Sequence, residues 1–397
     1  MSMRLDGCAQ SLPSSFSLHC GEAMGAVAFF PWLAVHDYSE VGPLRLIPYE
    51  RGVSPGDMPS IKRVDLDNVL NAYRGQSRFA AVQRAVLVEW AEWQSGMPID
   101  GFNEGFLLAQ EALSFAALAT RKLFVGHGSD VNFSAYELVV QRFTPGDAHG
   151  FAFAVRRRDG ATLSYWTSDE YKFFRPHHVP AAAMLQFESD LLEALLVLPT
   201  SIERSFREAV REFNAANSDG PNMPQHLELV MMKSAFEWLL SIDEKATSFV
   251  RALEERLSGI PVRGHAESSE AGWKIRWQGH TRPLIAWARE FCAIRGLSAH
   301  GKRGGVAGFV WSIEAHLAFA SFLFPLLAKK FLSDHGVMVI SRRDSARLSY
   351  IDDYIGPDPY LWQRPRYEAG TRGHRVPVPE HPWGAVESRA RWSGIDA

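Results

Sequence analysis

The feature that most constrains the fold is a change of pattern near Ala181. From there to about residue 332 the chain carries one amphipathic or apolar helical segment after another, and no alternating strand pattern interrupts them. The connections between these segments are short, which favours antiparallel neighbours in a bundle. The sequence therefore predicts an all-α antiparallel helical bundle over residues 181–335.

Apolar stripes and helix-stop signals predict where the bundle helices begin and end. Residues 224–242 are apolar on most sides, which predicts a central helix. Gly259 and Pro261 end the next helix, Thr281 is a plausible N-cap for the one after it, and Gly296 ends that helix. The predicted helices cover residues 181–198, 201–219, 224–242, 243–259, 282–296 and 307–332, the last with a kink at Pro325.

The N-terminal half mixes strand and helix signals. Short apolar runs divided by Pro and Gly predict strands, residues 102–124 predict a helix, and Asp159-Gly160 predicts a two-residue hairpin turn. We therefore expect an α+β domain with an antiparallel meander over residues 26–180, whose ligand or partner the sequence leaves unknown. Residues 1–25 form a separate N-terminal segment, and residues 336–397 are expected to be an irregular tail rich in Pro, Arg, Trp and Tyr.

Composition excludes several classes of protein. The formal net charge is −3, so any nucleic-acid site must be a local basic patch. The only cysteines are Cys8, Cys20 and Cys292, which argues against a disulfide framework and for a reducing, cytoplasmic compartment. No cysteine or histidine cluster has zinc spacing, so no metal or cofactor is expected. Residues 317–328 are apolar but too short for a membrane span of about 20 residues, so we interpret them as a buried core helix.

One arginine–histidine pair stands out by its position. Arg295 and His300 are separated by four residues at the exit of a predicted bundle helix, although similar spacings occur three more times, as often as chance predicts. The surrounding segment, residues 281–304, carries five cations against Glu290 alone: Arg282, Arg289, Arg295, Lys302 and Arg303. A basic helix exit of this kind suits the binding of phosphates.

In this setting the sequence resembles a known family. The order "SAFEWLL", an amphipathic helix, "WAREFCAIRGLSAHGKRGG" and a long apolar helix resembles a HEPN domain, in particular those attached to variable N-terminal regions in prokaryotic defence and toxin proteins. The preceding "FREAVREFNAANSD" fits the helix that leads into such domains. The resemblance covers roughly residues 200–335, and it implies a HEPN-like helical bundle.

The resemblance also implies metal-independent cleavage of single-stranded RNA by a homodimer. Arg295 would stabilise the charge that develops on the phosphate, and His300 from each of two protomers would act as base and acid. Arg289, Lys302 and Arg303 would contact RNA. Glu237 is more simply a surface carboxylate or part of a buried pair.

Three alternatives remain open at this point. Arg295 near a helix C-terminus followed by glycine is an ordinary way to end a helix. Gly296 also departs from the family pattern, in which a polar residue often follows the arginine. This departure is compatible with a domain that binds RNA or nucleotide without cleaving it, or that only dimerises. Finally, the N-terminal half could be the enzyme and the bundle an oligomerisation handle, but that half carries no nucleophile, phosphate-loop or metal signature.

Overall fold

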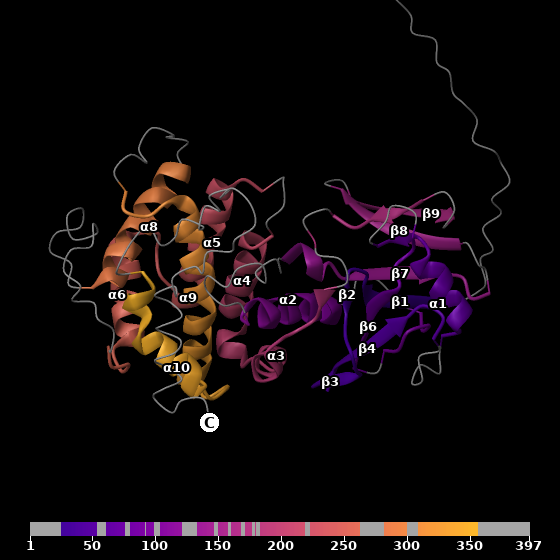
Figure 1. The fold of residues 1–397 in the computed structure, drawn as a ribbon, viewed down its shortest axis with the longest axis horizontal. Coiled ribbons are helices and arrows are strands. Elements are labelled where there is room, and N and C mark those ends of the chain that lie inside the picture. The colour runs from indigo at the N-terminus through magenta and orange to yellow at the C-terminus, as the bar shows by residue number, and fades with distance from the viewer. Residues whose placement is uncertain are drawn as a thin grey trace, which may run out of the picture.

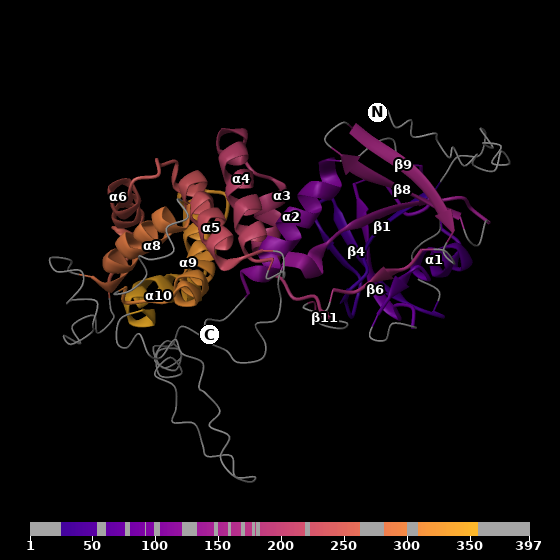
Figure 2. The ribbon, with the colours of Figure 1, turned by 90° about the horizontal axis from the view of Figure 1, so that it is seen from above.

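The protein has an N-terminal sheet region and a helix-rich C-terminal half, which lie at opposite ends of the molecule (Figures 1 and 2). The computed structural model describes residues 25–53, 61–75, 80–91, 93–98, 104–120, 133–146, 150–157, 160–167, 171–176, 179, 183–218, 223–262, 282–299 and 309–355. The predicted order, α+β first and helices second, is confirmed at this level.

The sheet has seven strands, and every neighbouring pair is antiparallel. Strand β1 (Gly25–Phe30) is buried along its whole length, which explains why it is a continuous apolar run rather than an alternating one. In spatial order the strands are β3 (Ser39–Val41), β4 (Leu44–Glu50), β6 (Arg84–Trp90), β1 (Gly25–Phe30), β7 (Val139–Phe143), β8 (Gly150–Arg157) and β9 (Gly160–Thr167).

The predicted hairpin in the meander is present, but Gly160 is not one of its turn residues. Strands β8 and β9 pair antiparallel with Gly160 opposite Arg157, so Gly160 is the first residue of β9. Helix α1 (Arg63–Leu70) and the 3₁₀ helix η1 (Phe133–Tyr136) complete this region. Two short parallel pairs also form, between β5 (Tyr73–Arg74) and β10 (Phe173–Phe174) and between β2 (Leu33–Ala34) and β11 (Ala183–Met184).

Five helices of the C-terminal half follow the predicted order: α4 (Thr200–Ala216), α5 (Gln225–Leu240), α6 (Ala246–Leu257), α8 (Pro283–Ala299) and α9 (Ile313–Asp334). Two predictions at the ends of this half were wrong. Residues 183–188 are not helical, because β11 pairs with β2 there and helix α3 begins only at Ser189, running Ser189–Leu196. The tail is also not irregular from residue 336, because helix α10 (Arg342–Ser349) and the 3₁₀ helix η2 (Ile351–Tyr354) lie in it.

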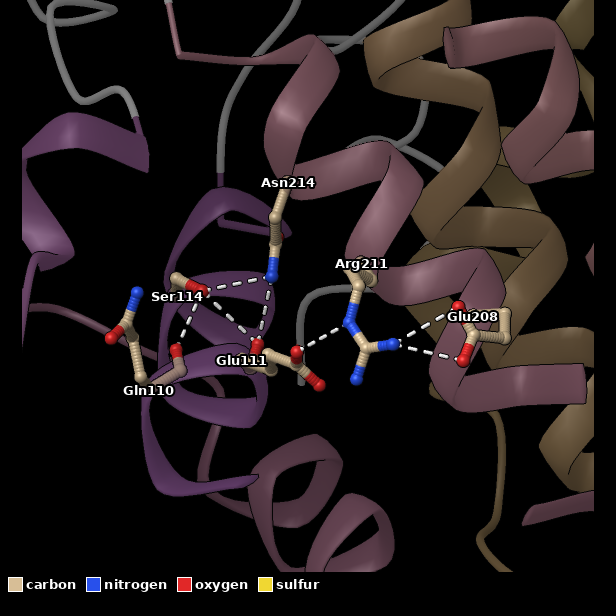
Figure 3. Close-up of polar contacts among 6 residues, drawn as sticks. All are labelled: Gln110, Glu111, Ser114, Glu208, Arg211 and Asn214. Atoms are coloured by element: carbon tan, nitrogen blue, oxygen red, sulfur yellow. Dashed lines mark hydrogen bonds and ion pairs between the residues drawn. The ribbon is translucent and has the colours of Figure 1, made fainter. Parts of the chain in front are cut away.

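Helix α2 (Glu104–Leu118) connects the two parts. It packs against α3 and α4, and Figure 3 shows the polar seam along α4. The Arg211 guanidinium lies 2.7 Å from the Glu111 carboxylate, and the Asn214 amide donates to the Glu111 carbonyl and to the Ser114 hydroxyl at 3.0 and 2.9 Å. Since one continuous hydrophobic cluster includes residues of the sheet, α2 and the bundle, the core crosses the boundary predicted at residues 180–181.

Phe324 of α9 lies where four helices meet. Its ring stacks on Phe213 of α4 at 4.7 Å between centroids, and it makes edge contacts with Phe115 of α2 at 5.9 Å and Phe236 of α5 at 5.3 Å. Such aromatic pairs contribute beyond the area they bury. Of the described helices, α9 alone is long and apolar enough to cross a membrane, but most of its apolar window is buried against other helices. The interpretation of residues 317–328 as a core helix is therefore confirmed.

The segment that follows α9 packs back against the helical half, where α10 contacts α9 and η2 contacts α8. The buried Lys329 ammonium of α9 lies 2.6 Å from the Glu188 carboxylate, just before α3, and 3.0 Å from the Asp344 carboxylate of α10. Asp352 of η2 accepts from the Leu284 backbone N–H at 3.0 Å and from Arg282 Nε at 2.8 Å, so it caps the N-terminus of α8. The predicted cap, Thr281, lies outside the described residues.

Replacing this distant cap should destabilise the protein. Asp352 is buried, and Asp352→Ala would leave the Leu284 N–H and the Arg282 guanidinium without their acceptor. We expect the free energy of unfolding in urea to fall by about 2–4 kcal/mol. Asp352→Asn keeps one acceptor and should lose less. Asp37, an exposed aspartate, supplies the control Asp37→Ala, and a loss no larger than that of the control would contradict the capping role.

Candidate anion-binding site on α8

Arg289, Cys292 and Arg295 lie along one side of α8. They are three residues apart, so each step turns by about 60° around the helix, which puts Arg289 and Arg295 about 120° apart with Cys292 between them. The opposite side of α8 is apolar and fixed in the core, where Trp287 stacks on Phe291 with centroids 4.9 Å apart and makes an edge contact with Phe319 of α9. The burial of that side therefore determines where the two arginines lie.

Within the described residues, the Nε atoms of Arg289 and Arg295 have no hydrogen-bond partner. The residues are partly buried, and the Nε atom of each is buried without a hydrogen-bond acceptor. Within the described ranges no carboxylate forms an ion pair with Arg289 or Arg295. A buried, unsatisfied donor on a charged group costs about 1–3 kcal/mol or more, so an anion that accepted from the guanidinium groups would stabilise this arrangement.

A third cation faces the same side of α8 from α5. The Lys233 side chain is buried, its ammonium lies 2.7 Å from the Glu237 carboxylate, and it sits 5.0 Å from the centre of the Phe249 ring. Lys233 and Glu237 act electrostatically on Cys292, as do both arginines. The Glu237 carboxylate is therefore the ion-pair partner of Lys233. Together, Arg289, Arg295, Lys233 and Glu237 carry three positive charges and one negative charge.

Cys292 at the centre of this group is not a nucleophile. Burial raises the pKa of its thiol to about 11, even though Lys233, Arg289 and Arg295 act to lower it. A thiol with that pKa is protonated at neutral pH and does not attack. Among the described residues, Arg289, Arg295 and Lys233 therefore offer a ligand fixed positive charge.

Helix α8 does not stop at Gly296, contrary to the prediction. It continues to Ala299, and its last turn holds no basic residue, so Arg295 is not a helix-terminal cation. A break at Gly296 that would swing the following residues toward Arg295 is absent. A Cβ added at Gly296 would meet no atom of the described residues within 4 Å, so no packing requirement among them explains the glycine.

The structure brings together two of the five predicted site residues. Arg289 and Arg295 lie on one side of α8, whereas His300, Lys302 and Arg303 lie outside the described residues. The sequence did not predict that Lys233 belongs to this group. The i,i+4 spacing from Lys233 to Glu237 was the available signal, but it is typical of many exposed helix surfaces.

A buried polar cluster behind the site holds the start of α9 against α8. Glu290 is fully buried and accepts from the backbone N–H groups of Val310 and Trp311 at 3.0 and 2.8 Å, with His316 Nε2 at 3.3 Å. Burial lowers the pKa of His316, so the ring is neutral and its Nε2–H donates to Glu290. Glu290 thereby fixes the segment that enters α9.

Among the described residues, no group of three or more His, Cys, Asp and Glu side chains could hold a metal ion. Comparisons with protein-family models, with curated proteins and with solved structures find no match to this chain. The interpretation of the site accordingly depends on its residues and their geometry.

Gly296 offers a direct test of the uninterrupted helix. Gly296→Ala should raise the free energy of unfolding by about 0.5–1 kcal/mol, because alanine loses less backbone entropy in a helix and meets no neighbour here. Gly336, which also has open space around it, adopts a φ of +70°, so Gly336→Ala should destabilise instead. Destabilisation by both substitutions in urea unfolding would contradict the helical conformation at Gly296.

The buried histidine predicts a pH dependence of stability. Because the folded-state pKa of His316 lies below its ordinary value of 6.5, the unfolded chain binds the extra proton as the pH falls through 6.5. The natural protein should therefore lose up to about 1.4 kcal/mol per pH unit below that point, relative to His316→Gln. Urea unfolding between pH 5 and 8 measures this. His226, an exposed residue, supplies the control His226→Gln, and equal pH slopes for all three proteins would contradict the assignment.

Proposed function

We propose that the C-terminal half is a HEPN-type domain that binds single-stranded RNA on α8 and cleaves it without a metal. The observation that supports this most directly is the pair Arg289 and Arg295, both partly buried on α8 and, among the described residues, without an acceptor for either Nε. The sequence resemblance over residues 200–335 supports the same function.

The charges of the site suit a phosphodiester. A guanidinium group is planar, stays ionised and can donate two parallel hydrogen bonds to phosphate oxygens. Lys233 is already neutralised by Glu237, so the two arginines are the cations left for a ligand. Two positive charges on one side of a helix match one or two adjacent phosphates of a nucleic-acid strand.

The proposed reaction is an attack of the ribose 2′-hydroxyl on the adjacent phosphorus. A base removes the hydroxyl proton, the bond to the 5′-oxygen breaks, and an acid gives that oxygen a proton, leaving a 2′,3′-cyclic phosphate and a 5′-hydroxyl. Arg295 stabilises the charge on the phosphate oxygens as it develops. His300 from each of two protomers takes the roles of base and acid, because one imidazole cannot serve both oxygens at once.

Unpaired RNA is the proposed substrate, since a single strand can reach the in-line geometry that this attack needs. The physiological role we propose is that of a defence or toxin effector. In that arrangement the N-terminal α+β region recognises a ligand or partner and controls the helical half, to which α2 connects it.

A second candidate is an RNA- or nucleotide-binding domain that does not cleave. Around the arginines, the described residues supply fixed charges but no acid or base for neutral pH. Glu237 is paired with Lys233, and the pKa of Cys292 is about 11. Gly296 also stands where many HEPN nucleases carry a polar residue. Both functions require the arginines, and only the first requires His300.

Cleavage of RNA in EDTA separates the two candidates. We expect the natural protein to cleave single-stranded RNA to 2′,3′-cyclic phosphate ends, His300→Ala to bind RNA without cleaving it, and Arg295→Ala to bind about 10–100-fold more weakly. The control is Arg251→Ala on α6, whose exposed side chain forms an ion pair with Glu255 at 3.8 Å. Gel analysis of the products and fluorescence anisotropy of labelled RNA measure both effects.

Each outcome decides between the proposals. Cleavage that is equal in the natural protein and in His300→Ala would contradict the nuclease mechanism. Binding without any cleavage by the natural protein would favour the second candidate. RNA affinity unchanged in Arg295→Ala would contradict both.

A further inference from the structure

Phe174 and Arg74 are neighbours on one face of the short parallel strand pair formed by β5 and β10. In the register of this pair, Phe173 lies opposite Tyr73. Their rings stack with centroids 4.8 Å apart and an interplanar angle of 14°, so these two side chains share a face. The next pair in the register is Phe174 and Arg74. Because side chains alternate along a strand, this second pair lies together on the opposite face.

The two faces of the strand pair differ in burial. Tyr73 is buried, and its ring makes an edge contact with Phe29 of β1 at 5.0 Å, so its face packs on the large sheet. Phe174 is 56% exposed, and Arg74 is partly buried. The buried face thus fixes the strand pair, while the other face presents an aromatic ring beside a guanidinium group. Arg74 and Phe174 together are the β5–β10 surface.

The fold makes little use of these two side chains. Within the described residues, the Phe174 ring makes no aromatic contact, and the Arg74 side chain forms no hydrogen bond or ion pair. Aromatic and arginine side chains in such positions are the ones that most often anchor a ligand or a partner. Both groups of the β5–β10 surface are therefore available for binding.

Positive charge surrounds the exposed ring. Arg175 directly follows Phe174, and its backbone N–H donates to the Arg74 carbonyl at 3.2 Å. The Nε atom of Arg175 is buried and has no acceptor among the described residues. Lys172 adds a third cation, and residues 171–176 contain no acidic residue. This charge favours an anionic ligand.

A nucleic-acid strand suits this surface better than a protein partner does. The anchors of a protein interface are surrounded by contacts that exclude water. Phe174 instead has cations beside it on its own strand and on β5. Single-stranded nucleic acid offers both groups that such a surface binds, a base that stacks on an aromatic ring and a phosphate that pairs with a cation.

We propose that the β5–β10 surface binds single-stranded nucleic acid, with a base stacked on Phe174 and a phosphate on Arg74. This inference goes beyond the proposed function, because the surface belongs to the N-terminal region rather than to α8 and does not require cleavage. It assigns a class of ligand to that region. Since every base has a flat face, the contact strengthens binding without selecting a sequence, and it favours single strands over duplexes, whose bases are already stacked.

Oligonucleotides with and without bases test this proposal. The probes are a fluorescein-labelled 2′-O-methyl oligouridine, which cannot be cleaved because it lacks the free 2′-hydroxyl, and an abasic strand of the same length. The starting protein is the full chain with Arg289→Ala and Arg295→Ala, which removes the proposed site on α8. In this protein we expect Phe174→Ala to weaken binding of the oligouridine about 10-fold and to leave the abasic strand unaffected. Phe174→Tyr should keep most of the affinity, and Arg74→Ala should weaken binding of both probes.

Two matched controls come from the same region. Tyr38 is an exposed aromatic residue, and Arg84 of β6 is an exposed arginine that lies 3.6 Å from Glu50. Tyr38→Ala and Arg84→Ala should bind both probes as the starting protein does. Fluorescence anisotropy measures the affinities, and urea unfolding checks that each variant is folded.

The outcomes separate this inference from the proposed function. Affinities that are unchanged in both Phe174→Ala and Arg74→Ala would overturn it. If Phe174→Ala changes the elution volume in size-exclusion chromatography and leaves both affinities unchanged, the surface is a protein contact and the inference is also overturned. If the natural protein binds the oligouridine but the starting protein does not, the site on α8 stands and the β5–β10 surface does not.

Discussion

The packing of Phe324 is the contact on which the rest of the structure depends. This one ring of α9 touches Phe115 of α2, Phe213 of α4 and Phe236 of α5. It therefore joins the helix that leaves the sheet to the helices of the C-terminal half, and it brings α5 into the position from which Lys233 faces α8. Because protein interiors are close-packed, a change in the orientation of one of these helices would shift the others.

Helix α8 is held from three directions. Trp287 and Phe291 bury its apolar side, Glu290 binds the residues that lead into α9, and Asp352 caps its first turn. With these contacts made, α8 cannot rotate to place its arginines in the core or beside a carboxylate of the described residues. In the proposed function, a helix held in this way would be preorganised for an anion, so little binding energy would be lost in ordering the site.

Much of this fold follows from local sequence patterns. The apolar run of β1, the hairpin of β8 and β9 and the boundaries of α4, α5 and α6 were predictable because turn residues and periodicity specify them locally. Contacts between distant residues were not predictable in the same way. The cap on α8 comes from Asp352, 68 residues beyond Leu284, and Glu290 binds a segment 20 residues away.

The errors have the same origin. Residues 183 and 184 are good helix formers, but they pair with β2, about 150 residues earlier in the chain. Gly296 costs a helix about 1 kcal/mol, which the buried side of α8 outweighs. Of the site itself, Arg289 and Arg295 were predictable as a basic helix segment, whereas Lys233 depends on how α5 packs against α8.

The central claim is that Arg289 and Arg295 bind phosphates, and the salt dependence of RNA affinity tests it most directly. Each phosphate contact on a single strand contributes about 0.7 to the slope of log affinity against log salt concentration. The account predicts that replacing both arginines by alanine makes this slope shallower by about 1.4, together with a loss of affinity at low salt. An unchanged slope in the double variant would contradict the account, because any RNA that is bound would then lie elsewhere on the protein.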